Sequence, residues 1–234
     1  MTTAAVIVAA GRGERMKGAE DLPPKQLRLV AGKPVLSYSV EFFDRLTVID
    51  CISVVTRPEL QEAIKKAGVG ATTRKPLVWA KGGARRQDSS RNGVLALPDD
   101  VDLVAIHDAV RPFPPERATL EAIAAARECG GAILAVPVAD TVKRADESGH
   151  IVETVDRAGL WLAQTPQVFQ RRLLMEAFET AEKRGIALTD EASAFELMGW
   201  PVRIIPGTLT NLKITTREDL ARAEAYAAGA IRRE

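Results

Sequence analysis

Short apolar runs and segments of helical spacing alternate along most of the chain. Continuous apolar runs bounded by turn residues are typical of strands that are buried on both faces, whereas apolar residues spaced three or four apart indicate amphipathic helices. Strands are predicted at 4–10, 51–56, 76–80, 103–108, 132–138, 202–207 and 212–215. Helices are predicted at 34–46, 58–68, 90–97, 114–131, 170–185, 189–199 and 217–227, with Thr189 or Asp190 as the N-cap of the sixth. This alternation predicts an α/β fold with a mostly parallel sheet that is covered by helices on both faces.

One polar stretch, residues 140–157, interrupts the alternation. Its two short alternating arms flank a DESG turn, which predicts a β-hairpin. An isolated two-stranded hairpin is marginal in water, so we expect this one to pack against something else, for instance a second copy of the chain.

The composition limits the classes of partner. The 234 residues suffice for one sizeable core, which predicts a single domain over residues 1–234. The net charge is only +1, from 32 cations and 31 anions, which argues against nucleic acid or an acidic membrane surface as the main partner. No apolar run approaches membrane-spanning length, so no membrane association is expected.

Cysteines and histidines narrow the chemistry further. Cys51 and Cys129 lie in apolar settings and are expected to be buried thiols of a reducing compartment. The only two histidines, His107 and His150, are too few for a multi-histidine metal site. The start, MTTAAVIVAAG, carries no basic leader, and we therefore expect a cytoplasmic protein.

The loop after the first predicted strand combines glycines with basic residues. In an open parallel sheet this loop lies at the ligand-binding edge. It is not a dinucleotide fingerprint, because Met16 stands where the third glycine would be, and no Gly-Lys-Ser/Thr follows as in a P-loop. Its cations are Arg12, Arg15, Lys17 and Lys25. Together with backbone amides they suit a polyphosphate, but the loop alone is equally consistent with a glycine turn that carries solvated charges.

Two further segments end at the same edge. Asp108, in IHDAVRP (106–112), leaves the fourth predicted strand where a carboxylate could hold Mg²⁺, although by itself it is better explained as the cap of a turn before Pro112. GGARRQDSSRNG (82–93) is a second glycine-rich loop, in which Asp88 or Ser89 could simply cap a helix. The three segments together indicate a nucleotide, its phosphates and a metal.

No side chain stands out as a nucleophile or general base. None is needed if the nucleophile is itself a phosphate monoester, which is largely dianionic at pH 7 because its second pKa is about 6. The protein then contributes positioning and charge neutralisation, which is the chemistry of nucleotidyl transfer.

The motifs resemble those of the 2-C-methyl-D-erythritol 4-phosphate cytidylyltransferase family, nucleotidyltransferases of the non-mevalonate isoprenoid pathway. The resemblance covers residues 4 to about 227. It is carried by AAGRGERM (9–16), PKQ (24–26), GGARRQDS (82–89), HDAVRP (107–112), DTVKR (140–144), TVDRAGLW (154–161), QTPQVF (164–169), TDEAS (189–193) and NLKIT (211–215).

The resemblance implies a Rossmann-like fold whose hairpin, at about 139–159, is the arm of a homodimer. It also implies transfer of CMP from CTP to 2-C-methyl-D-erythritol 4-phosphate, with release of pyrophosphate and with Mg²⁺ or another divalent cation as cofactor. The substrate phosphate would attack the α-phosphate of CTP in line.

Site residues follow motif by motif from the same resemblance. Nucleotide contacts are expected at Ala9, Ala10, Gly11, Gly13, Gly83, Ser89 and Ala109. The charge that develops during the reaction would be supported by Arg15, Lys25 and Lys213, while Asp108 would serve Mg²⁺. The methylerythritol phosphate would be bound by Arg111, Thr141, Arg157 and Thr189, of which Thr141 and Arg157 would come from the other subunit's hairpin.

Four positions depart from the usual family pattern: Ser90, Val94, Val110 and Thr210. The loop from Met16 to Lys25 is also longer than in compact members. The main alternative is a cytidylyltransferase of the same fold that acts on ribitol 5-phosphate or another polyol phosphate. A non-catalytic nucleotide-binding subunit is a second alternative, against which the joint presence of Arg15, Lys25, Asp108 and Lys213 argues.

Overall fold

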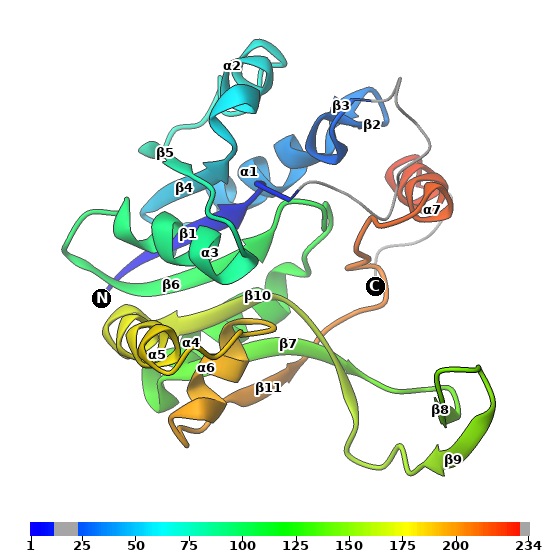
Figure 1. The fold of residues 1–234 in the computed structure, drawn as a ribbon. Helices are drawn as coiled ribbons and strands as arrows, with labels where there is room; N and C mark the ends of the chain where they lie inside the picture. The colour runs from blue at the N-terminus through cyan, green and yellow to red at the C-terminus, as the bar shows by residue number, and fades with distance from the viewer. Residues whose placement is uncertain (12–22, 230–234) are drawn as a thin grey trace.

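A seven-stranded sheet forms the centre of the protein (Figure 1). The computed structural model describes residues 1–11 and 23–229. The strand order is β11-β7-β10-β6-β1-β4-β5. These strands are β1 (Thr2–Val8), β4 (Cys51–Thr56), β5 (Leu77–Lys81), β6 (Val101–Asp108), β7 (Gly131–Pro137), β10 (Trp161–Gln170) and β11 (Arg203–Pro206). All neighbouring pairs are parallel except those that involve β10, so the predicted α/β class is confirmed.

Helices cover both faces of the sheet, as the sequence predicts. The helical segments of the described residues are η2 (Lys25–Leu27), α1 (Val35–Arg45), α2 (Pro58–Lys66), α3 (Arg86–Leu95), α4 (Glu116–Cys129), α5 (Arg171–Lys183), α6 (Glu191–Leu197) and α7 (Arg217–Ala227). Alternate residues of β1 belong to two separate buried clusters. Ala5 and Ile7 pack with α1 and α4, whereas Ala4 and Val6 pack with α3, α5 and α6. Burial on both faces explains why the inner strands are continuous apolar runs.

The prediction failed at β10, which the sequence pattern did not reveal. This strand runs for ten residues between β6 and β7 and is antiparallel to both. Its middle, Gln164–Thr165–Pro166–Gln167, is polar and contains a cis peptide bond before Pro166. The register of β10 against β7 shifts between Ala163 and Gln167, so the pairing of the two strands is irregular there. Polar residues and a proline in one stretch conceal a strand from any test of apolar periodicity.

Residues 212–215 were predicted to be a strand, which is wrong. The segment is irregular, and the Ile214 N–H donates a hydrogen bond to the Val110 carbonyl, just beyond the end of β6, at 2.9 Å. Lys213, in this irregular segment, contacts Asp108 at the end of β6.

Two small hairpins lie outside the main sheet. The predicted one is confirmed as β8 (Val142–Ala145) and β9 (Ile151–Val155), which pair antiparallel and protrude from the rest of the molecule (Figure 1). The other, β2 (Leu29–Val30) with β3 (Lys33–Pro34), was not predicted. Its turn residues Ala31 and Gly32 both have positive φ, of 47° and 74°, as the tight type I′ hairpin turn requires.

Local capping and cysteine placement add two details. Asp190, rather than Thr189, is the N-cap of α6, since its carboxylate accepts a hydrogen bond from the Ser193 N–H at 3.0 Å. Both cysteines are free thiols, as predicted, but only Cys51 is buried, whereas Cys129 is half-buried. Within the described residues, no helix is both long and apolar enough to cross a bilayer.

Candidate active site

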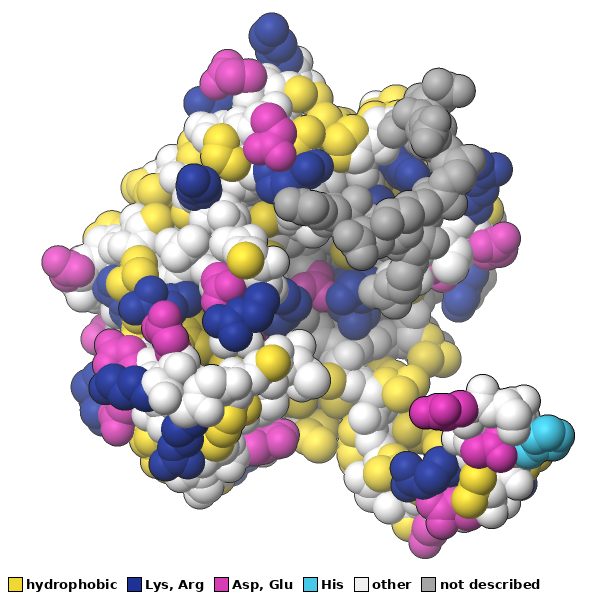
Figure 2. Space-filling model, viewed as in Figure 1, with side chains coloured by type: hydrophobic (Ala, Val, Ile, Leu, Met, Phe, Trp, Pro, Cys, Tyr) yellow, Lys and Arg dark blue, Asp and Glu magenta, His cyan; other side chains and the backbone are white. Residues whose placement is uncertain are grey.

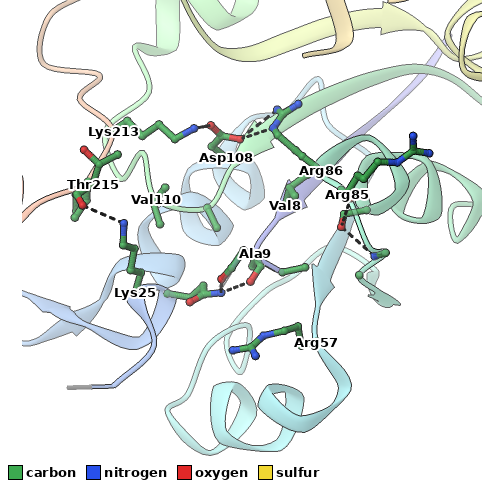
Figure 3. A pocket seen from close by; sticks show the side chains of 18 of the residues that line it. Val8, Ala9, Lys25, Arg57, Arg85, Arg86, Asp108, Val110, Lys213 and Thr215 are labelled. Carbon is green, nitrogen blue, oxygen red and sulfur yellow. Dashed lines mark hydrogen bonds and ion pairs between the residues drawn. The ribbon is translucent and has the colours of Figure 1, made fainter. Parts of the chain in front are cut away.

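A cavity of about 550 Å³ opens where β1, β5 and β6 end (Figure 3). These ends lie at the same edge of the sheet because β6, β1, β4 and β5 are consecutive and parallel in the strand order, with β4 between β1 and β5. The lining residues include Ala9, Ala10, Gly11, Lys25, Gly83, Ser89, Asp108, Ala109 and Lys213. Every one of these was predicted as a site residue, from four segments far apart in the sequence. In the space-filling view, Lys and Arg side chains border a hollow on this face (Figure 2).

Gln26 fixes the path of the chain as it leaves β1. Its side-chain amide donates hydrogen bonds to the carbonyl of Ala9 and, at 3.2 Å, to that of Gly11. Lys25, the neighbouring residue on η2, projects into the cavity, and its Nζ donates to the Thr215 carbonyl at 3.1 Å (Figure 3). Gln26 was not predicted as a site residue, although it stands inside the PKQ motif.

The second glycine loop packs closely against Ala10 and against the start of α3. A Cβ on Gly82 would lie 2.3 Å from the Cβ of Ala10, and a Cβ on Gly83 would lie 2.3 Å from that of Asp88. Real side-chain carbons do not approach that closely, so glycine is required at both positions. Ser89 braces the loop by accepting from the Gly83 N–H at 3.0 Å and donating to the Arg85 carbonyl at 3.2 Å. Gly82 was also missed by sequence reasoning, which selected only Gly83.

Asp108 lies at the centre of a network of charges. Its Oδ2 lies 2.7 Å from Nζ of Lys213, and its Oδ1 lies 3.2 Å from both Nε and Nη2 of Arg86 (Figure 3). Nη1 of Arg86 in turn contacts both carboxylate oxygens of Glu191, at 2.8 and 2.9 Å. Ser90 completes the network by donating to Oε1 of Glu191 at 2.7 Å.

Neighbouring opposite charges keep Asp108 and Arg86 ionised despite their burial. Burial alone would raise the pKa of Asp108, but Arg86 and Lys213 hold it well below its usual range. Burial would likewise lower the pKa of Arg86, but the carboxylates of Glu191 and Asp108 raise it above its usual value. Asp108 therefore stays a carboxylate at neutral pH and is not a proton donor. Arg86 and Glu191 are the functional candidates that sequence reasoning missed; the only sequence signal for them is that each lies inside a motif, GGARRQDS or TDEAS.

His107 lies behind Asp108 and does not reach the cavity. It is fully buried, with one ring nitrogen 3.1 Å from Oγ1 of Thr165 and the other 3.0 Å from the Arg111 carbonyl. Burial lowers its pKa to about 4, so the ring is neutral at pH 7. Thr165 also accepts from the Asp108 N–H at 3.1 Å, so this buried group supports the end of β6 and serves no acid–base role.

The predicted acceptor-binding residues do not line the cavity. Arg111 donates to the carbonyl of Asn211 at 2.7 Å, next to the strand end that carries Asp108. Thr189 is exposed in the turn before α6. Thr141 and Arg157 are exposed on the protruding hairpin, where Arg157 donates to the Ala139 carbonyl. Gly13 and Arg15 fall outside the described residues.

The donor set suits a divalent cation only if a nucleotide supplies most of its ligands. Within the described part of the chain, no three His, Cys, Asp or Glu side chains are grouped to hold a metal ion. Mg²⁺ is commonly bound through one or two carboxylates together with substrate phosphates and waters. Asp108 offers one such carboxylate beside a cavity lined by Lys25, Arg57, Arg85 and Lys213, which suits phosphates. The residues thus fit a Mg²⁺ that arrives with a nucleotide. Because both oxygens of Asp108 already contact Lys213 or Arg86, the ion would share an oxygen with one of these cations.

Comparison with known proteins gives consistent matches over nearly the whole chain. The sequence model of the family described as IspD, 2-C-methyl-D-erythritol 4-phosphate cytidylyltransferase, matches residues 3–228. A 2-C-methyl-D-erythritol 4-phosphate cytidylyltransferase of Caldanaerobacter subterraneus is 42% identical over 227 residues, which cover 97% of this chain and 99% of the relative. The bifunctional enzyme IspD/IspF of Desulforudis audaxviator is 44% identical over 97% of this chain, which spans 57% of that longer protein. The crystal structure of 4-diphosphocytidyl-2C-methyl-D-erythritol synthase from Anaerococcus prevotii aligns with a TM-score of 0.83 at 31% identity, covering 97% of this chain and 96% of that one.

Proposed function

The chain belongs to the 2-C-methyl-D-erythritol 4-phosphate cytidylyltransferase family, and on that premise we propose that it transfers the cytidylyl group of CTP to 2-C-methyl-D-erythritol 4-phosphate. The products are 4-diphosphocytidyl-2-C-methyl-D-erythritol and pyrophosphate. The observation that carries the proposal is the cavity at the ends of β1, β5 and β6, where two glycine loops meet Lys25, Asp108 and Lys213.

The reaction needs no proton transfer from the protein. An oxygen of the acceptor phosphate forms a bond to the α-phosphorus of CTP, and the bond from that phosphorus to the bridging oxygen of the β-phosphate breaks. The acceptor is already largely dianionic at pH 7, since its second pKa is about 6. Catalysis then consists of bringing two anions together and neutralising the charge that gathers on the transferring group.

Lys25 and Lys213 are the described cations best placed for that task. Both line the cavity, and each is held by an oxygen of another segment: Lys25 by the Thr215 carbonyl and Lys213 by Asp108. Cations fixed before the substrate arrives stabilise developing charge without further reorganisation. Arg15 belongs to the same proposal on the family resemblance. Asp108 would hold Mg²⁺, directly or through water, and the ion would neutralise phosphate charge and help the pyrophosphate to leave.

A homodimer is the second part of the proposal. Large apolar side chains are exposed on the hairpin, where Ile151 is 66% and Val152 62% exposed, and near the start of β10, where Leu162 is 57% exposed. Apolar groups gathered on a protruding arm favour contact with another protein surface. In the dimer, Thr141 and Arg157 of one subunit would complete the acceptor site of the other. The cytoplasmic location stays a prediction from the sequence.

A panel assay tests the reaction. Purified protein and Mg²⁺ are combined with each of the four nucleoside triphosphates and with several polyol phosphates, and release of pyrophosphate is measured. Release is expected only with CTP and 2-C-methyl-D-erythritol 4-phosphate together. Release with ribitol 5-phosphate instead would favour the alternative substrate. If none of the acceptors on the panel supports release, the proposal is overturned.

A further inference from the structure

Glu191 is a buried carboxylate that lies behind Arg86, a residue of the cavity wall. Its side chain is 1% exposed, and it is the first residue of α6. Both of its oxygens contact Nη1 of Arg86, and one accepts a third bond from Ser90. Arg86 lines the cavity, whereas Glu191 does not. Glu191 thus contacts the lining of the cavity through Arg86.

Stability alone is a weak reason for such a pair. Removing two charges from water is costly, and buried ion pairs are often no more stabilising than apolar residues of the same size. The geometry offers another reason. The guanidinium of Arg86 is planar, and it is held at one end by Glu191 and at the other by Oδ1 of Asp108. Fixing a planar fork at both ends fixes its orientation.

Fixing Arg86 also fixes Asp108. With Oδ1 engaged by Arg86, Oδ2 is the oxygen left for Lys213, which it contacts at 2.7 Å. Charges alternate along the series from Glu191 through Arg86 and Asp108 to Lys213, and their formal sum is zero. Removing the charge of Glu191 would leave the remaining three with a net positive charge beside the cavity.

A second contact joins the same two segments. Oε1 of Gln87, the residue after Arg86, accepts from the Leu188 N–H at 2.8 Å. Leu188 directly precedes Thr189, the proposed acceptor-binding residue. Helix α3, which follows the second glycine loop, is thus bound to the start of α6 through Arg86 and Ser90 and to the turn before it through Gln87.

From these contacts we infer that Glu191 is a positioning residue for the cytidylyl transfer proposed above: through Arg86 and Asp108 it sets the location of the Lys213 ammonium group. Ser90 contributes to the same positioning, since its hydroxyl donates a hydrogen bond to the Glu191 carboxylate that holds Arg86. Ser90 is also one of the four positions at which this chain departs from the usual family pattern. The inference rests on the proposed function, because the effect of Glu191 is defined on that reaction.

The central experiment compares Glu191→Gln with wild type and with Glu196→Gln, an exposed control on the same helix. Glutamine keeps the volume and can still accept from Ser90, but it removes the charge that holds Arg86. The expected result is a fall in kcat of about 10- to 100-fold, since a displacement of about 1 Å costs about 100-fold. The KM for CTP and the CTP dissociation constant from calorimetry should stay unchanged or fall, because the cavity becomes more positive. General structural damage would raise both of them.

A double-mutant cycle with Lys213→Ala separates positioning from indirect damage. If Glu191 acts through Lys213, adding Glu191→Gln to Lys213→Ala should change kcat by less than about twofold, because effects that run through a shared residue do not add. Two multiplicative effects would overturn the inference, as would a wild-type kcat in Glu191→Gln.

Should Glu191→Gln fail to fold, as judged by circular dichroism, Ser90→Ala takes its place in the same cycle. That variant keeps every charge and should still lower kcat by at least about twofold in the wild-type background, through the loss of one hydrogen bond to a charged group. An unchanged kcat would then overturn the inference. Wild-type protein in the same assay distinguishes the two levels of failure: an inactive wild type overturns the proposed function and this inference with it, whereas an active wild type with unaffected variants overturns the inference alone.

Discussion

The ammonium group of Lys213 and the carboxylate of Asp108 lie 2.7 Å apart, although the two residues come from an irregular C-terminal segment and from the end of a central strand. The contact accounts for a lysine whose side chain is only 36% exposed, since Asp108 offsets the cost of withdrawing its charge from water. It also gives Asp108 two candidate roles, as an anchor for Lys213 and Arg86 and as a ligand for Mg²⁺.

Asp108→Asn tests these two roles together. Asparagine keeps the shape but removes the charge, and its amide would face Lys213 or Arg86. We expect kcat to fall and the Mg²⁺ concentration for half-maximal activity to rise, measured by pyrophosphate release across a Mg²⁺ titration. Chelation with EDTA should abolish wild-type activity in the same series. A lower kcat with a wild-type Mg²⁺ requirement would limit Asp108 to anchoring the two cations.

Lys25→Ala should act mainly on the chemical step. Its ammonium group lines the cavity and is already held by the Thr215 carbonyl, so it is placed to meet charge that appears in the transition state. We expect kcat to fall by about 100-fold or more and the KM for CTP to change much less. Steady-state kinetics with CTP as the varied substrate measures both. Lys33→Ala is the matched control, because Lys33 forms an exposed ion pair with Glu41. If kcat of Lys25→Ala equals that of the control, Lys25 does not contribute to catalysis.

The sequence predicted the walls of the cavity better than the contacts within it. Ala9 to Gly11, Gly83 and Asp108 could be assigned to one edge because parallel strands end at the same edge of a sheet, and loops with glycine mark where those ends turn. The pairing of Arg86 with Glu191 could not, since the two residues lie 105 positions apart and only the fold brings the start of α3 to the start of α6. Strand β10 was not predicted for a related reason: its polar residues make contacts that exist only in the folded protein, such as that of Thr165 with His107.

Two glycines that line the cavity, Gly82 and Gly11, should respond differently to replacement by alanine. At Gly82 a Cβ would lie 2.3 Å from the Cβ of Ala10, so Gly82→Ala should destabilise the fold by about 1–3 kcal/mol, the usual cost of overpacking. At Gly11 a Cβ would meet no heavy atom within 4 Å among the described residues, so Gly11→Ala should leave thermal stability near wild type.

The functional effect of Gly11→Ala then reports on the ligand. A nucleotide that approaches the Gly11 backbone would collide with the added methyl group, and we expect the KM for CTP to rise with little change in the melting temperature. Thermal denaturation and steady-state kinetics of the two variants give the comparison. A wild-type KM for CTP in Gly11→Ala would mean that the nucleotide does not approach this part of the cavity.

The hairpin allows the sharpest test of the proposed dimer. Arg157 is exposed near the base of the protruding arm and does not line the cavity of its own chain, whereas Lys213 does. If Arg157 serves the partner's site, it would bind the acceptor phosphate as a bidentate fork, and Arg157→Ala should raise the KM for 2-C-methyl-D-erythritol 4-phosphate while CTP binding stays near wild type. Lys213→Ala should damage the chemical step instead.

In a heterodimer of the two variants, one of the two shared sites has both residues intact, as the twofold symmetry of a closed dimer requires. Activity in a mixture should therefore exceed the sum of the separate variants once subunits have exchanged, which mass spectrometry of differently tagged chains can follow. Confirmed exchange without recovery of activity would show that Arg157 and Lys213 do not meet across a subunit boundary.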